Sequence, residues 1–191
     1  FYIQRGTKQG DPISPVLFNA VLEKVMRKLK DKWRREGKGI KVGSAADDFL
    51  QNLRFADDLL SLGSSKAHVV SMLEDLFIEA AAVGLEIHMG KTKILSNGIG
   101  PGTKSTDVTL TRGKVQILNR SEATMYLGRA LNLRTTHDTE LNHRISKGWA
   151  KFGVFRKELT DKHYSLRDRL RSSNAVVTPC ILYGCSSWVM T

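Results

Sequence analysis

The chain has 191 residues, with 30 lysines and arginines against 19 aspartates and glutamates, a formal net charge of +11 and a pI near 9.8. This basic balance favours a polyanionic partner, and nucleic acid fits best. No segment approaches the roughly 20 apolar residues needed to span a membrane, and none is a Trp-anchored amphipathic stretch, so no membrane role is expected. Two cysteines and no signal peptide indicate a reducing, intracellular compartment.

The first predicted element is a helix opened by a glycine-bearing loop. Gly6 and Gly10 permit backbone conformations and close approaches that a β-carbon would forbid. Ser14 followed by Pro15 predicts an N-cap and the first helical position of a helix that runs to about Arg34. A glycine-rich loop that opens a helix is a natural anion site. The alternative is a capped amphipathic helix whose basic face is merely solvated.

The next predicted feature is a β-hairpin with two adjacent carboxylates at its tip. The glycines of residues 36–39 end the helix, and residues 39–43 form a short strand. Residues 49–55 and 59–62 form the hairpin arms around Asp57 and Asp58. Carboxylates are costly to bury unless paired or bound to metal, and closely spaced carboxylates hold the ions of two-metal nucleotidyl transfer. The alternative is a simple Asp-Asp turn.

The remaining pattern predicts a helix, several strands and a helical tail. Ser64 and Ser65 cap a helix that ends at Gly84. Strands are expected at residues 85–88, 93–96, 108–110, 114–118 and 124–131, with a loop at 97–106. From about Thr139 a helical pattern places apolar residues on one side: Leu141, Ile145, Trp149, Phe152, Phe155 and Leu159. The order indicates an α+β fold.

Several of these segments together resemble the palm of reverse transcriptases, most closely those of LINE-type non-LTR retrotransposons. The residues that match motif B are Arg5, Gly6, Gln9, Gly10, Asp11, Pro12, Ser14, Pro15, Leu17 and Phe18. Residues 55–58 (Phe-Ala-Asp-Asp) resemble motif C, residues 84–93 resemble motif D, and residues 126–128 (Tyr-Leu-Gly) resemble motif E. The tail containing Tyr183, Gly184 and Trp188 resembles the segment that follows the palm in these elements.

The resemblance implies a role for each motif. Asp57 and Asp58 would bind Mg²⁺ or Mn²⁺ and serve catalysis, and Lys91 would stabilise or protonate the pyrophosphate leaving group. The nucleotide- and template-binding residues would be Arg5, Gly6, Gln9, Gly10, Pro12 and Ser14. Tyr126, Leu127 and Gly128 would form the primer grip. The domains implied are a partial palm over residues 1–134 and a thumb-like or post-palm segment over residues 135–191.

The chain also departs from the family pattern. His88 stands where the family commonly has Asn, and motif A, which carries another metal-binding aspartate, would lie upstream of Phe1. We therefore interpret the chain as part of a longer polyprotein that needs its upstream part and does not polymerise alone, because two carboxylates are too few for an octahedral magnesium site. Its expected partners are an RNA template, a DNA primer and deoxynucleoside triphosphates, in the nucleus or a cytoplasmic ribonucleoprotein.

Two alternatives within this resemblance stay open. The chain is either part of an active RNA-directed DNA polymerase or a catalytically inactive nucleic-acid-binding remnant of a retroelement. A maturase similar to those of group II introns is a third reading of the same fold. Two other sites are rejected. Residues 84–92 have five residues between the glycines where a phosphate-binding P-loop has four, and His137, His143, Cys180 and Cys185 lack the spacing of a zinc site.

Overall fold

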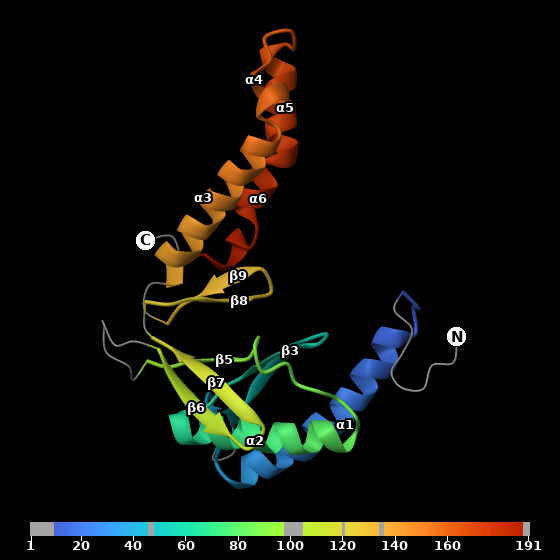
Figure 1. Ribbon diagram of the computed structural model, residues 1–191, viewed down its shortest axis with the longest axis vertical. Helices are drawn as coiled ribbons and strands as arrows, with labels where there is room; N and C mark the ends of the chain where they lie inside the picture. The colour runs from blue at the N-terminus through green and yellow to red at the C-terminus, as the bar shows by residue number, and fades with distance from the viewer. Residues whose placement is uncertain (1–9, 46–47, 98–104, 120, 134–135, 189–191) are drawn as a thin grey trace. The chain divides into compact units, whose positions relative to one another are not determined.

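The computed structural model describes residues 10–45, 48–97, 105–119, 121–133 and 136–188. Helices and small sheets alternate along the chain, which confirms the α+β class (Figure 1). The chain divides into two compact units. The first unit is Phe1–Ile94 with Thr106–Ile117, and the second unit is Leu95–Ser105 with Leu118–Thr191. None of the described helices is both long and apolar enough to cross a membrane.

The first unit contains two long helices and three small sheets. Its elements are α1 (Ser14–Arg35), β1 (Ile40–Lys41), β2 (Phe49–Leu50), β3 (Asn52–Phe55), β4 (Asp58–Ser61), α2 (Lys66–Ala82), β5 (Lys93–Leu95), β6 (Thr106–Leu110) and β7 (Gly113–Leu118). β1 pairs with β2 and β3 with β4, while β5, β7 and β6 form a three-stranded sheet in that order. Figure 1 shows β6 and β7 crossing above α2, and the amide and hydroxyl of Thr111 in the turn between them both donate to Glu74 of α2.

Both helices of the first unit end in the same way. After α1, Gly37 has a φ of +64° while the amide of Lys38 donates to the carbonyl of Trp33. After α2, Gly84 has a φ of +77° while the amide of Leu85 donates to the carbonyl of Ala80. This is the Schellman stop, in which a left-handed residue lets the chain satisfy the last carbonyls of the helix. The glycines therefore end the helices where the sequence predicted.

The start of α1 differs from the prediction by one residue. Ser14 is the first residue of the helix and Ile13 takes the N-cap position, so Ser14 is not the N-cap. The carboxylate of Asp11 accepts the amide of Ile13 at 3.0 Å, and its carbonyl accepts the amide of Ser14 at 3.1 Å. An aspartate that accepts a hydrogen bond from the backbone two residues later commonly forms a turn. Here Asp11, and not Ser14, supplies the side-chain hydrogen bond that precedes the helix. Ser65, by contrast, caps α2 as predicted and accepts the amide of His68.

The core of the first unit is the contact between α1 and α2. The buried apolar side chains are Val25, Met26, Leu29 and Trp33 of α1, and Met72, Leu73, Leu76, Phe77 and Ala80 of α2. Asp75 adds a polar contact, accepting from Lys32 Nζ at 2.6 Å and Trp33 Nε1 at 3.0 Å. Burial raises the pKa of the Asp75 carboxyl, but these two donors outweigh burial and leave the pKa below its usual value. The pairing gives the indole N–H of the buried Trp33 a partner within this mostly apolar contact.

Three strand predictions need correction. Residues 85–88, all described, form no strand, because Leu85 is used by the stop of α2 and His88 opens a turn. The first arm predicted at residues 49–55 is divided: β2 pairs with β1, and β3 pairs with β4. Residues 124–131 are a hairpin and not one strand, since Leu127 and Gly128 have φ of +49° and +76° and reverse the chain.

The second unit is a hairpin followed by a helical arm. Its elements are β8 (Thr124–Tyr126), β9 (Arg129–Leu131), α3 (Thr136–Val154), α4 (Arg156–Thr160), α5 (Leu166–Val176), α6 (Thr178–Leu182) and the 3-10 helix η1 (Cys185–Ser187). α3 contacts β9 at one end and α6 along its length, and α4 and α5 lie at the far end of the arm (Figure 1). The predicted domain boundary near residue 134 lies outside the described residues and stays a prediction.

The apolar side of α3 is not its buried side. Leu141, Ile145 and Trp149 are 45%, 40% and 65% exposed. The buried positions are one residue earlier in each turn, at Glu140, Arg144 and Gly148. Both sets repeat every four residues, so periodicity cannot choose between them, and the contacts with β9 and α6 decide. An ion pair and a glycine therefore take the place of the expected apolar stripe.

Candidate functional site

The carboxylates of Asp57 and Asp58 lie at the tip of the β3–β4 hairpin. Phe55 pairs with Asp58 across the hairpin, so Ala56 and Asp57 form the turn and Asp58 is the first residue of β4. Ala56 has a φ of +51°, a left-handed conformation that costs free energy for a residue with a β-carbon. Both aspartates are exposed, and neither has a hydrogen-bond or ion-pair partner among the described residues. The tip therefore presents two unneutralised carboxylates side by side.

Glu23 of α1 anchors the hairpin to the first helix. Its carboxylate accepts from Arg54 of β3 at 2.5 Å and from Arg27 at 2.8 Å. Hydrogen bonds from Arg27 and Arg54 lower the pKa of Glu23 from 4.5 to about 2. Arg54 is the basic residue nearest to the aspartates along the chain. Arg54 is therefore paired with Glu23 and not with the tip aspartates.

A groove of about 490 Å³ lies between α1 and the hairpin. Its lining residues are Asn19, Leu22, Glu23 and Lys30 of α1, and Asn52, Leu53, Arg54 and Ala56 of the hairpin. The side-chain nitrogen of Asn52 is buried and has no hydrogen-bond partner among the described atoms. The motif B helix and the motif C hairpin therefore share one polar groove, as the resemblance requires.

Asp57 and Asp58 offer the oxygen ligands that Mg²⁺ and Mn²⁺ prefer. The described residues contain no group of three or more His, Cys, Asp or Glu side chains close enough to hold a metal ion. The two carboxylates therefore fit as two members of the ligand set of such an ion.

The described part of motif B begins at Gly10. Gly10 has a φ of +89° and Pro12 lies in the exposed turn before α1, while Ser14 begins the helix. A residue with a β-carbon would be strained at Gly10, although there is open space around it. Arg5, Gly6 and Gln9 lie outside the described residues, so their predicted roles stay predictions.

Lys91 lies in an exposed turn of the same unit. Its amide donates to the carbonyl of His88 at 3.1 Å and also faces Nδ1 of His88 at 3.3 Å. Nδ1 of histidine is separated from the main chain by as many bonds as the amide oxygen of asparagine, so His88 can hold this turn in place of the family's Asn. In the described residues, no hydrogen bond or ion pair joins the side chain of Lys91 to either aspartate.

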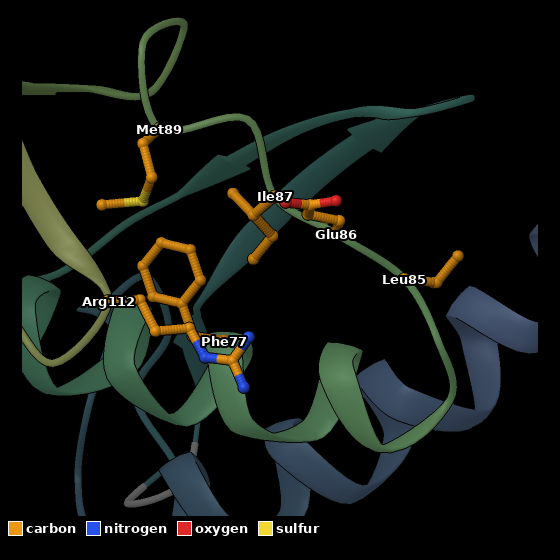
Figure 2. Close-up of a pocket in the computed structure, with 6 residues that line it drawn as sticks. All are labelled: Phe77, Leu85, Glu86, Ile87, Met89 and Arg112. Carbon is orange, nitrogen blue, oxygen red and sulfur yellow. The ribbon is translucent and has the colours of Figure 1, made fainter.

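A smaller hollow of about 290 Å³ lies behind this turn (Figure 2). It is lined by Phe77 of α2, by Leu85, Glu86, Ile87 and Met89 of the motif D segment, and by Arg112. Met89 also lies close to Gly113 at the start of β7. Apolar side chains thus seat the motif D segment on α2, although the segment is not a strand.

The motif E residues Tyr126, Leu127 and Gly128 lie at the tip of the β8–β9 hairpin in the second unit. Leu127 and Gly128 both have positive φ, as in a type I′ turn. Glycine adopts this conformation without strain, whereas leucine does not. The residues that anchor the two hairpins, Glu23 and Arg144, were not predicted from the sequence. Their one sequence signal is an acid four residues before an arginine, at Glu23–Arg27 and Glu140–Arg144.

Comparisons with known proteins confirm the resemblance to reverse transcriptases. The family model described as "Reverse transcriptase (RNA-dependent DNA polymerase)" matches residues 1–131. A transposon-derived protein of Caenorhabditis elegans is 31% identical over 142 residues, which are 73% of this chain and 49% of that protein. The retrovirus-related Pol polyprotein of the type-2 retrotransposable element R2DM of Drosophila melanogaster is 26% identical over 200 residues, covering 85% of this chain and 18% of the polyprotein.

A shorter stretch is more similar to a third relative. The retrovirus-related Pol polyprotein of a type-1 retrotransposable element R2 of Popillia japonica is 48% identical over 61 residues, which are 32% of this chain and 9% of the polyprotein. The chain thus spans less than half the length of each of these relatives. No solved structure matches it significantly.

Proposed function

Since the chain belongs to the reverse transcriptase (RNA-dependent DNA polymerase) family, we propose that it is the part of an RNA-directed DNA polymerase that contributes Asp57 and Asp58 to the reaction centre. The observation that carries the proposal is the exposed carboxylate pair at the tip of β3–β4, beside the groove that the hairpin shares with α1. The relatives named as retrotransposon Pol polyproteins support a longer chain as the working enzyme.

The carboxylates would bind Mg²⁺ or Mn²⁺ together with ligands from elsewhere in the longer chain. When bound, such ions activate the attacking primer hydroxyl and neutralise charge on the leaving pyrophosphate. The protein's own part is to keep the tip charged and in place. Glu23 does both, because it holds Arg54 to α1 and keeps that guanidinium paired away from the aspartates.

Other motif residues have supporting roles in this proposal. The Gly10 turn and the start of α1 would lie against the template base and incoming nucleotide, where a chain without a β-carbon allows close approach. Lys91 would supply positive charge to the pyrophosphate, and the Tyr126–Gly128 turn would hold the primer strand. The proposed partners are an RNA template, a DNA primer and deoxynucleoside triphosphates, in the nucleus or in a cytoplasmic ribonucleoprotein.

The test is primer extension by the longest chain that carries these residues. Asp57→Asn keeps the size of the side chain and removes its charge, so we expect extension to fall by roughly a thousandfold or more, and Asp58→Asn to fall by less. Asp107→Asn is the matched control, because Asp107 is an exposed aspartate of β6 in the same unit. Extension by Asp57→Asn at the rate of the unchanged chain would remove Asp57 from the reaction.

Binding measurements separate the polymerase from the catalytically inactive remnant. A net charge of +11 predicts affinity for a primer–template duplex that falls steeply with added salt. Salt-sensitive binding without extension by the unchanged chain would favour the remnant. Salt-independent binding would contradict both proposals.

A further inference from the structure

The turn at Leu127 and Gly128 is held by two side chains that lie far from it in the sequence of the second unit. The hydroxyl of Tyr183 donates to the carbonyl of Leu127 at 3.0 Å. The guanidinium of Arg144 donates to the carbonyl of Gly128. These carbonyls belong to the two residues with positive φ, so both anchors act on the strained part of the hairpin.

The two anchors also hold each other. The guanidinium of Arg144 lies over the Tyr183 ring, 4.8 Å from its centroid, and such a cation–π contact strengthens when water is excluded. The Tyr183 ring in turn covers Gly128: a β-carbon at Gly128 would lie 3.3 Å from Cε1 and 3.4 Å from the hydroxyl oxygen of Tyr183. A β-carbon at Gly128 would therefore crowd the Tyr183 ring and also strain the backbone at a φ of +76°.

A buried carboxylate completes the arrangement. Glu140 is 1% exposed, accepts from Nε of Arg144 at 2.7 Å and from the amide of Ala130 in β9 at 2.7 Å. Burial raises the pKa of Glu140, but the Ala130 amide and the Arg144 guanidinium outweigh burial and hold the pKa below its usual value. Glu140 thus holds the Nε end of Arg144 while a terminal nitrogen donates to the Gly128 carbonyl, and the rigid plane of the guanidinium links the two contacts.

We propose that Tyr183 and Arg144 are positioning residues that set the orientation of the Leu127–Gly128 turn, and through it the position of the primer end. This inference rests on the proposed function, in which that turn contacts the primer. The two anchors act on the turn and not on nucleic acid. Their loss therefore disorders the primer terminus without removing a contact that binds the duplex.

The experiment uses the extending polymerase chain with Tyr183→Phe, which removes the hydroxyl and keeps the ring over Gly128. The control is Tyr164→Phe, because Tyr164 is 55% exposed in the link between α4 and α5. Single-turnover extension is measured beside duplex affinity and the midpoint of thermal unfolding. A primer ending in 2-aminopurine reports stacking of its last base by fluorescence.

We expect Tyr183→Phe to slow extension by roughly threefold to tenfold, the size of one lost hydrogen bond, with duplex affinity unchanged. The 2-aminopurine fluorescence of the bound primer rises, the Tyr183→Phe chain stays folded at the assay temperature, and the Tyr164→Phe control stays at the reference values. Arg144→Lys keeps the charge but loses the fork, and is expected to slow extension and raise the fluorescence more strongly.

Gly128→Ala forces a β-carbon into the turn. This variant separates the positioning role of Tyr183 from the primer contact of the turn itself. If Gly128→Ala slows extension while Tyr183→Phe matches the reference, the positioning role is wrong and the primer contact stands. If neither variant changes extension or fluorescence, the positioning role and the primer contact of this turn are both wrong, while the Asp57 test still decides the polymerase assignment. A drop in unfolding midpoint that accounts for the lost activity would reduce Tyr183 to a structural residue.

Discussion

In the first unit α1 meets α2 through apolar side chains around Trp33 and Met26, whereas in the second unit α3 meets the β8–β9 hairpin through Glu140 and Arg144. Apolar contact is not directional, so it tolerates small rotations of one helix on another. A guanidinium and a carboxylate demand particular distances and planes. The apolar interface between α1 and α2 therefore holds two helices together without fixing their angle closely. The polar interface between α3 and the β8–β9 hairpin fixes the orientation of the Leu127–Gly128 turn.

The largest expected effect is the loss of Trp33. Its side chain is fully buried between α1 and α2, so Trp33→Ala should lower the free energy of unfolding of the first unit by about 3–5 kcal/mol. Trp149→Ala is the control in the second unit, since Trp149 is 65% exposed and its loss should cost within about 0.5 kcal/mol. Urea unfolding followed by far-ultraviolet circular dichroism measures both, because Trp33→Ala removes the tryptophan of the first unit and with it that unit's fluorescent reporter. Equal costs would contradict the comparison.

Removal of one partner of the buried ion pair should cost almost as much. Glu140→Leu leaves Arg144 buried without its counter-charge, which typically costs about 3 kcal/mol or more. The double variant Glu140→Leu with Arg144→Leu should recover part of this loss, because two apolar side chains then replace two charges. Unfolding of both variants in urea gives the coupling. Additive losses would show that the two groups do not act as a pair.

Two glycine-to-alanine variants within α3 are expected to have smaller effects on stability, and of opposite sign. A β-carbon at Gly148 would lie 2.5 Å from Cγ1 and 2.9 Å from Cδ1 of Ile181 in α6, so Gly148→Ala should destabilise the arm by about 1–3 kcal/mol. Gly153 is in the same helix and has nothing within 4 Å, so Gly153→Ala should stabilise it by about 0.5–1 kcal/mol. Thermal unfolding of the two variants tests the close α3–α6 approach. Stabilisation by both would rule it out.

The smallest effect is the pH dependence of the hairpin anchor. The folded-state pKa of Glu23 is lowered to about 2, so its contribution is complete above the unfolded-state value near 4.5 and is lost as pH falls from 4.5 towards 2. Glu23→Gln should remove this part of the acid dependence, with the rest of the curve unchanged. Urea titrations at a series of pH values measure the difference, and identical curves would show that the Arg54 and Arg27 contacts do not stabilise the fold.

Sequence patterns predicted the elements that local chemistry decides. The extent of α1, the serine cap of α2 and the glycine stops at Gly37 and Gly84 all follow from neighbouring residues. The acidic hairpin tip was also recognisable, because β-forming residues flank two aspartates. The domain boundary and the roles of individual site residues remain predictions.

The errors occur where distant residues decide. Glu140, Arg144 and Gly148 have the same spacing as Leu141, Ile145 and Trp149, and only contact with β9 and α6 selects the buried set. Tyr183 donates to the carbonyl of Leu127 although the two residues are 56 positions apart in the sequence, and no local pattern reveals such a contact. Residues 124–131 read as one strand because Leu127 gives no sign that its backbone is left-handed.

Two tips of the chain, at Ala56 and Leu127, turn through a residue that pays for its left-handed backbone. Replacing either residue by glycine would remove the free-energy cost of the left-handed backbone and make the folded protein more stable. The same change would loosen a loop that presents chemical groups to a partner. A laboratory selection for thermal stability alone would accordingly favour glycine at these two positions. A selection for primer extension would retain Ala56 and Leu127.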